Sequence, residues 1–321
     1  MDTLPKANIT ELEWRRRCVI ALGLAPGANS GRLNRLASLL PPERIMEETK
    51  AALADTSILP SDVTWLEKAI AGDSQRLLDQ AERQLALCKK HNAQIIACLD
   101  KDYPLNLRES STAPALLFVR GTLHPDIDRC SIAIVGSRDS SHLGRRRASG
   151  LAQTVASFDW VVISGLARGI DTAAHEGALA ANGRTLAVVG CGLDRTYPPE
   201  NAELADRIAE SGAIISQFPF GTPPAGHNFP QRNKTMALLS LATVVVEAGE
   251  QSGAKMQADF ALNTHTPQRR VFFPRSLVES QSESGWVHQF MRRGAEVIEK
   301  VEDVIPRLRS SVVQQTTLPM F

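Results

Sequence analysis

Short apolar stretches recur along the chain from about residue 93 onward, and the later ones are separated by helical segments of ten or more residues. Such alternation is typical of a largely parallel sheet with helices on both faces. The pattern therefore predicts a doubly wound α/β domain over residues 93–308. The expected strands are Gln94–Leu99, Ala115–Val119, Ser131–Val135, Trp160–Ile163, Thr185–Val189, Ala213–Ser216, Ala242–Glu247 and Arg270–Phe273.

Residues 1–92 carry the spacing of amphipathic helices and predict a small helical domain. One helix is expected after the Pro26-Gly27 turn, and Asp73-Ser74 suits the start of a longer one. Residues 309–321 are too few to fold alone and predict a flexible tail. The apolar faces expected for the two helices are Leu33, Leu36, Leu39 and Leu40, and Leu77, Ala81, Leu85 and Cys88.

Composition narrows the class of protein. With 43% hydrophobic residues among 321, the chain can bury a core, and its net charge of +1 creates no global attraction to a polyanion. Its five cysteines form no CxxC pair, which argues against a zinc finger or disulfide framework and favours a reducing compartment. Without a signal-peptide core or a membrane-length apolar run, we expect a cytoplasmic protein with no membrane partner and no cofactor.

The segment Ser164–His175 follows one expected strand and precedes an alanine-rich helix. Backbone N–H groups and the helix dipole favour an anion at such a turn. Gly165 and Gly169 allow a positive φ or close approach of a ligand. Ser164 belongs to the same expected phosphate-binding turn, and Arg168 is expected to project toward the anion. Asp171 is expected to cap the helix.

Gly136-Ser137-Arg138 forms a second turn of this kind after the strand Ser131–Val135. Gly136 permits close backbone contact, Ser137 offers a hydroxyl, and Arg138 is suited to bind a phosphate. The next helix carries the run Arg145–Arg147. Because this is not a GxGxxG motif, an ordinary turn followed by a solvated arginine run remains the alternative.

A third basic segment runs from Asn228 to Lys234 and contains no carboxylate. Cations beside an aromatic ring fit recognition of single-stranded nucleic acid, whose bases are unstacked. Phe229 is equally suited to stack on a base or to fill the core. Ser252 and Gly253, in a glycine turn after another strand, complete the expected phosphate-binding set. Its members in this region are Asn228, Phe229, Arg232, Asn233, Lys234, Ser252 and Gly253.

Three further residues have a chemical and a structural interpretation. His175 with Glu176 suggests half of a metal site, but no third ligand is apparent, so a packing histidine is favoured. Cys191 lies in a glycine-rich turn without a neighbouring base, which favours a small buried residue over a nucleophile. Glu247 suits either a catalytic carboxylate or a hydrogen bond to a neighbouring turn.

Taken together, these motifs resemble those of the DNA processing protein A (DprA, or Smf) family. The similarity extends over residues 15–308 in five ordered blocks. They are Tyr103-Pro104 with Leu117–Gly121, Ile134–Arg138, Ser164–Asp171, Gly190–Asn201 and Asn228–Asn233.

The resemblance implies an extended Rossmann-like domain behind a helical domain of sterile-alpha-motif or helix-hairpin-helix type. It implies a homodimer that binds single-stranded DNA, without catalytic residues, and that assists loading of a RecA-type recombinase in transformation, recombination or repair. Arg138, Arg168, Phe229, Arg232 and Lys234 would then line the DNA pocket. A winged-helix domain at the carboxyl end is not expected.

Two other functions remain open. The same fold variant resembles nucleoside-monophosphate phosphoribohydrolases, with Glu247 or Glu250 as the catalytic carboxylate, although the chain lacks their Pro-Gly-Gly-x-Gly-Thr loop. A sensor of a nucleotide-derived ligand is the other alternative. In the tail, Gln315, Leu318 and Phe321 have the spacing of a short peptide that docks on replication sliding clamps.

Overall fold

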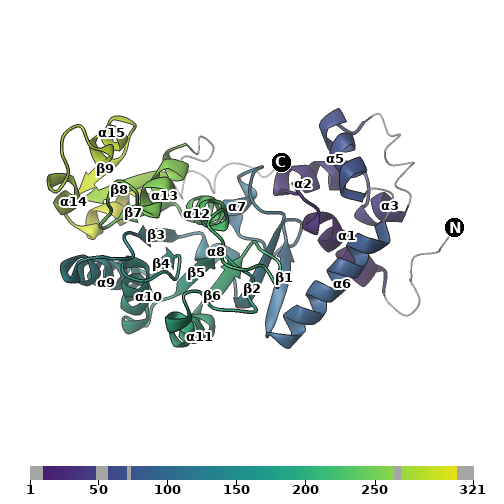
Figure 1. Ribbon diagram of the computed structural model, residues 1–321, viewed down its shortest axis with the longest axis horizontal. Helices are drawn as coiled ribbons and strands as arrows, with labels where there is room; N and C mark the ends of the chain where they lie inside the picture. Colours follow the sequence, from purple (N-terminus) through teal and green to yellow (C-terminus); the bar gives the residue numbers. More distant parts are fainter. Residues whose placement is uncertain (1–9, 48–56, 71–73, 264–268, 309–321) are drawn as a thin grey trace.

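The computed structural model describes residues 10–47, 57–70, 74–263 and 269–308. Its centre is a nine-stranded sheet with the order β1-β2-β6-β5-β4-β3-β7-β8-β9 (Figure 1). The strands are β1 (Ala93–Ala97), β2 (Leu116–Gly121), β3 (Ser131–Val135), β4 (Val161–Ser164), β5 (Thr185–Val189), β6 (Ala213–Ser216), β7 (Ala242–Val245), β8 (Arg270–Pro274) and β9 (Glu296–Ile298).

The sheet is mostly parallel. Strands β3 to β9 pair in parallel, whereas β1 and β2 form an antiparallel hairpin that joins the sheet through β6. All eight strands expected from the sequence are present, so the predicted α/β class is confirmed. The three-residue β9 was not predicted, because so short a segment carries no period of its own.

Helices cover both faces of the sheet, as in a doubly wound fold. Side chains of a strand alternate between the faces: in β3, Ile132 and Ile134 pack with α9 and α10, whereas Ala133 and Val135 belong to the core under α12 and α13. In Figure 1, α9, α10 and α11 lie below the sheet, with α12 and α13 above it. Their bounds are α9 (His142–Ser157), α10 (Ile170–Ala180), α11 (Ala202–Ser211), α12 (Asn228–Leu239) and α13 (Gly253–Leu262).

The helices before residue 91 pack directly on the β1–β2 edge and share one apolar core with the sheet. Arg16 donates to the Ile95 carbonyl at 2.9 Å, and the amide of Gln84 exchanges hydrogen bonds with the Phe220 backbone. The domain type named above for this region stays a prediction. The helices are α1 (Glu11–Leu24), α2 (Ser30–Leu39), α3 (Pro42–Glu47), α5 (Pro60–Ile70) and α6 (Ser74–Lys90).

One detail of the expected apolar faces is wrong. Leu39 is 44% exposed, whereas Leu33, Leu36 and Leu40 are buried. At 3.6 residues per turn, Leu33, Leu36 and Leu40 lie within about 60° of one another around the helix, whereas Leu39 lies about 60° beyond the edge of that stripe.

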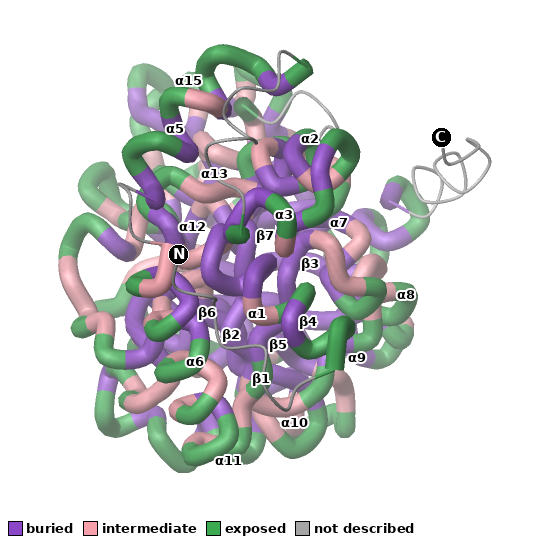
Figure 2. The backbone as a smooth tube through the Cα atoms, turned by 90° about the vertical axis from the view of Figure 1, so that its right-hand side faces the viewer, coloured by how far each residue is buried: buried purple, intermediate pink, exposed green. Residues whose placement is uncertain are grey.

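Burial follows this layout, with the strands buried and the outer helix faces exposed (Figure 2). No helix among the described residues has the length and apolarity that crossing a membrane requires. The remaining short elements are α7 (Leu105–Arg108), α8 (Pro125–Asp128), η1 (Pro199–Asn201), α14 (Arg275–Glu279), α15 (Trp286–Arg292) and η2 (Val301–Asp303).

Candidate nucleic-acid interface

A cavity of about 510 Å³ opens at the carboxyl end of β3, between β4 and β7. The chain leaves β3 toward β4 on one side and reaches β7 on the other side, so this is the topological switch point at which doubly wound sheets bind ligands. Three helices, α10, α12 and α13, each place a residue of their first turns at the cavity. Their positive dipole ends therefore converge there.

The loop after β3 supplies the exposed cation of the cavity. Ser137 is fixed by its backbone N–H, which donates to the Glu247 carbonyl at 2.7 Å. The next residue, Arg138, is exposed and makes no ion pair within the described residues. Its guanidinium carbon lies 5.1 Å from the centre of the Phe229 ring. Arg138 thus remains available to an anion while it rests on an aromatic side chain.

Phe229 lies in the first turn of α12 and is only partly buried. Its ring centre is 5.9 Å from that of Tyr197, whose side chain is exposed. On the inner side, a methyl group at Gly190 would approach the ring to 3.0 Å, so glycine there admits the ring. Phe229 therefore packs against the fold along one side and lines the cavity with another, and its stacking on a base stays a prediction.

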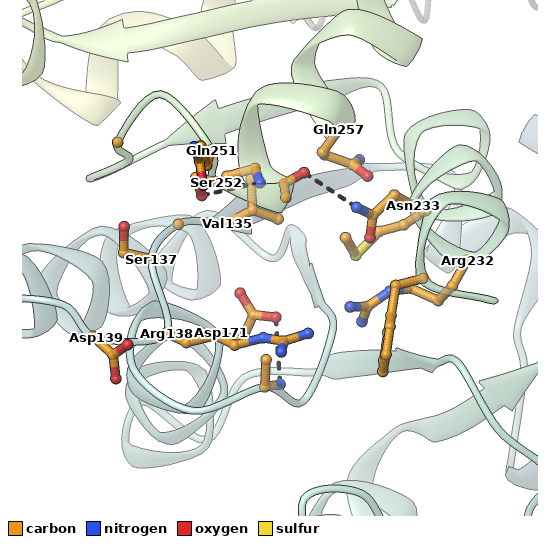
Figure 3. A pocket seen from close by; sticks show the side chains of 17 residues that line it. Val135, Ser137, Arg138, Asp139, Asp171, Arg232, Asn233, Gln251, Ser252 and Gln257 are labelled. Carbon is orange, nitrogen blue, oxygen red and sulfur yellow. Dashed lines mark hydrogen bonds between the residues drawn. The ribbon is translucent and has the colours of Figure 1, made fainter. Parts of the chain in front are cut away.

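Arg232 forms the floor of the cavity and is almost wholly buried, with 5% exposure (Figure 3). Its Nη1 donates to the carbonyls of Gly165 at 2.6 Å and Val188 at 2.7 Å. A Cβ at Gly165 would lie 1.8 Å from that nitrogen, so the glycine creates the space for the guanidinium. Burial lowers the pKa of Arg232, and the neighbouring Asp171 counteracts this shift.

Asp171 is not the helix cap that the sequence suggested. The residue before α10 is Gly169, whose φ of +78° suits glycine, and Asp171 lies inside the first turn. Its carboxylate accepts hydrogen bonds from the N–H groups of Gly165 at 3.2 Å and Ala167 at 3.4 Å. Burial raises its pKa, and the Arg232 charge opposes that rise. Asp171 therefore holds the loop that leads into the helix.

The opposite wall comes from α12 and α13. The Asn233 amide donates to the Gly253 carbonyl at 3.2 Å, and the Ser252 hydroxyl caps α13 by accepting from the Ala254 N–H at 3.2 Å. Gly136 also lines the cavity, as the sequence led us to expect. The lining residues that sequence reasoning did not single out include Asp139, Met236, Gln251 and Gln257. Only their position within or next to a predicted motif would have indicated them.

Several residues of the predicted set do not line this cavity. Ser164 donates to the Ile134 carbonyl at 2.7 Å, and Asn228 donates to the Gly190 carbonyl at 3.1 Å, so both support the backbone. Arg168 is 62% exposed and lies 3.4 Å from Glu200. Lys234 is partly buried farther along α12. Gly165 lies against the Arg232 guanidinium, and Gly169 lies against the Ser137 and Arg138 carbonyls. Gln315, Leu318 and Phe321 lie outside the described residues.

Glu247 has the structural role of the two expected for it, because it hydrogen-bonds a neighbouring turn. Its two carboxylate oxygens accept hydrogen bonds from the Ser141 N–H at 2.8 Å and the Ser141 hydroxyl at 2.6 Å. Ser141 in turn caps α9 by accepting from the Gly144 N–H at 2.9 Å. The other candidate, Glu250, is exposed and lies 3.1 Å from Lys255. Glu247 therefore fixes the start of α9 and does not line the cavity.

His175 and Cys191 also take their structural interpretations. His175 is fully buried, and its Nδ1 donates to the Thr185 hydroxyl at 2.8 Å, because that hydroxyl itself donates to the Val162 carbonyl. The described residues contain no cluster of three His, Cys, Asp or Glu side chains that would hold a metal ion. Burial raises the pKa of the Cys191 thiol to about 11, which keeps it in its unreactive form at neutral pH.

Burial gives His175 a measurable effect on stability. Burial, together with the Arg232 charge, lowers its pKa from 6.5 to about 3. Between these pH values the unfolded chain binds a proton that the folded chain excludes. The stability that neutral His175 allows is therefore fully present above pH 6.5, and the free energy of unfolding decreases as the pH falls below that value. We expect the wild type to lose about 2 kcal/mol more than His175→Gln between pH 7 and pH 5 in urea unfolding. Equal losses in the two proteins would contradict this assignment.

Comparison with known proteins identifies the family. Residues 94–309 match the model of DNA recombination-mediator protein A. A DNA processing protein DprA from Bacillus subtilis is 31% identical over 288 residues, which cover 88% of this chain and 95% of the relative. The chain belongs to the DNA recombination-mediator protein A family. A Protein Smf from Synechocystis is 38% identical over 213 residues, 65% of this chain and 52% of the relative. The chain thus spans about half the length of that relative.

Solved structures of the family have the same fold. DprA from Streptococcus pneumoniae superposes with a TM-score of 0.69 at 27% identity, over 94% of this chain and 98% of that one. DprA from Helicobacter pylori, described for its single-stranded DNA binding mode, superposes with a TM-score of 0.57 at 23% identity. The latter match covers 68% of this chain and 96% of that one. The resemblance stated from the motifs is therefore confirmed at the level of family and fold.

Proposed function

We propose that this protein binds single-stranded DNA in the switch-point cavity and acts as a binding protein rather than as an enzyme. The observation that carries the proposal is the pair of Arg138 and Phe229, an unpaired cation resting on a partly exposed ring. Such a pair offers one contact to a phosphate and one to a base. Membership of a recombination-mediator family, and the binding mode described for the Helicobacter pylori relative, support the same ligand.

Local charge at the cavity is arranged for an anion even though its formal charges balance. Two arginines and two aspartates line it: Asp171 is buried and faces Arg232, whereas Arg138 and Asp139 are both exposed, so the formal charges leave no excess of either sign. The first turns of three helices add partial positive charge. We infer that phosphates approach from the Arg138 side, and that Arg232 stabilises the floor.

The positions of the two candidate catalytic carboxylates, Glu247 and Glu250, do not support a phosphoribohydrolase. Glu247 is held by Ser141, and Glu250 lies next to Lys255 outside the lining. A nucleotide sensor would use the same cavity, and the two ligands are separated by comparing oligothymidine with thymidine monophosphate as competitors. Single-stranded DNA binding predicts that the mononucleotide competes only at far higher concentration.

Substitution of the ring tests the proposal most directly. Phe229→Ala is expected to weaken binding of an oligothymidine by about 1–3 kcal/mol, the value of one stacked base, and Phe229→Tyr is expected to retain most of the affinity. Arg138→Ala should also flatten the dependence of log affinity on log salt by about 0.7, the value of one phosphate contact. Fluorescence anisotropy at several salt concentrations measures both effects.

The control for charge is Arg207→Ala, which removes an exposed arginine on α11 away from the cavity lining. If Phe229→Ala and Arg138→Ala bind as tightly as Arg207→Ala, the placement of DNA in this cavity is wrong. A wild-type protein that prefers duplex DNA, or that shows no salt dependence, would overturn the proposal as a whole.

We further propose that the protein forms a homodimer and assists a RecA-type recombinase on single-stranded DNA, in keeping with its family. The supporting test is ATP hydrolysis by a purified recombinase on DNA already covered by a single-strand-binding protein. Addition of this protein is expected to shorten the lag, and Phe229→Ala to lose that effect. An unchanged lag with the wild type would contradict the role, and sedimentation of the purified chain tests the dimer.

A further inference from the structure

A second hollow of about 280 Å³ lies between α9 and α10, outside the cavity described above. The helix α9 contributes His142, Arg145 and Arg146 to it, and α10 contributes Thr172 and Glu176. We refer to this hollow as the α9–α10 groove. Figure 1 shows the two helices side by side below the sheet.

The three arginines that run along α9 have no charged partner among the described residues. Within the described residues, Arg146 and Arg147 make no ion pair, and Arg145 uses its Nη1 only to donate to the Ser140 carbonyl at 2.6 Å. Adjacent like charges repel one another and contribute nothing to packing when all three side chains are exposed. Arg145 and Arg146 line the groove, whereas Arg147 lines a separate hollow beside β8. An anion bound at the groove would give Arg145 and Arg146 a charged partner.

The groove and the cavity share a wall. Ala167 and Asp171 line the cavity, whereas Gly169 and Thr172 of the same segment line the groove. Gly169 also lies against the loop that carries Arg138, since a Cβ there would come within 2.4 Å of the Ser137 and Arg138 carbonyls. A chain leaving the cavity past Arg138 has only this thin segment to cross before it reaches Arg146.

We propose that the α9–α10 groove binds a further phosphate of the same DNA strand that occupies the cavity. This inference rests on the proposed function and adds a second contact to the same strand. Arg145 and Arg146 supply the charge, and Glu176 on the facing helix opposes it. The groove thus makes affinity depend on the length of the strand.

Two substitutions of opposite sign test the groove. Arg146→Glu is expected to weaken binding of an oligothymidine of about 16 nucleotides by about 3- to 10-fold, and Glu176→Gln to strengthen it by about 2- to 3-fold. Neither is expected to alter binding of an oligomer of about 4 nucleotides, which fills the cavity alone. Both side chains are exposed, so the thermal unfolding midpoint should remain unchanged.

Arg207→Glu on α11 is the matched control for an added negative charge. Phosphate binding at the groove is supported if the two groove variants change the affinity for the long oligomer alone, in opposite directions, and Arg207→Glu does not change it. Three results would contradict phosphate binding at the groove without affecting the proposed cavity site. They are equal changes in affinity for both oligomer lengths, a similar change in Arg207→Glu, and no change in either groove variant. If the wild type binds neither length, the proposed function fails as well, so the two failures are distinguishable.

Discussion

Arg232→Ala is expected to lower the free energy of unfolding by about 3–5 kcal/mol, the cost of breaking a buried charge pair. The substitution leaves the Gly165 and Val188 carbonyls without their donor and Asp171 without its neighbouring cation. It also opens a space below Gly165, where the guanidinium now lies. Urea unfolding followed by circular dichroism measures the loss.

Arg138→Ala is the matched comparison, because it removes the other arginine of the cavity. Arg138 is exposed, so we expect its loss to change stability by less than about 0.5 kcal/mol while it weakens DNA binding. The two arginines should therefore separate a structural role from a binding role. If Arg232→Ala unfolds at the wild-type urea concentration and binds DNA more weakly, Arg232 contacts the ligand directly, and our description of the cavity floor is wrong.

Gly169→Ala is expected to lower the free energy of unfolding by about 2–5 kcal/mol. A left-handed conformation costs a residue with a Cβ about 1–2 kcal/mol, and overpacking against fixed atoms typically adds about 1–3 kcal/mol. Here φ is +78°, and the new methyl would lie 2.4 Å from the Ser137 and Arg138 carbonyls. Since those carbonyls belong to the loop that presents Arg138, DNA binding should weaken as well.

Gly150→Ala controls for the change of residue type. Gly150 lies on the exposed side of α9 with no atom within 4 Å of an added Cβ, so alanine there should stabilise the helix by about 1 kcal/mol. Thermal and urea unfolding of the two variants should thus shift in opposite directions. A Gly169→Ala protein as stable as the wild type would show that the two loops do not approach as closely as the structure indicates.

The order of strands and helices could be predicted from sequence because each element has its own periodic pattern of apolar residues, which it buries in the core. The buried run Ile132–Val135 and the helix at Ile170–Ala180 carry local patterns that hold in any context. The antiparallel hairpin of β1 and β2 was beyond this reasoning, since strand direction depends on pairing between distant segments. The likeness to a known family indicated the Rossmann-like fold, but it did not indicate this antiparallel pairing.

The candidate site was only partly predictable for a different reason. Motifs indicate which loops meet at the switch point, and Gly136, Arg138 and Phe229 were found in this way. They do not indicate how deep a side chain lies: Arg232 and Arg168 look alike in sequence, yet one is buried and the other is 62% exposed. Gln257, one turn inside α13, becomes part of the lining only through the packing of α12 against α13.

The continuous core beneath the β1–β2 edge has a mechanical consequence. Leu116 of β2 packs so closely on Gly23 of α1 that a methyl group there would meet it at 2.6 Å, and Gln84 of α6 is tied to Phe220 beyond β6. Sliding the helices over the sheet would separate apolar surfaces that are buried together. The helices and the sheet therefore form one rigid unit, so conformational adjustment on binding of the proposed single-stranded DNA would fall on the DNA.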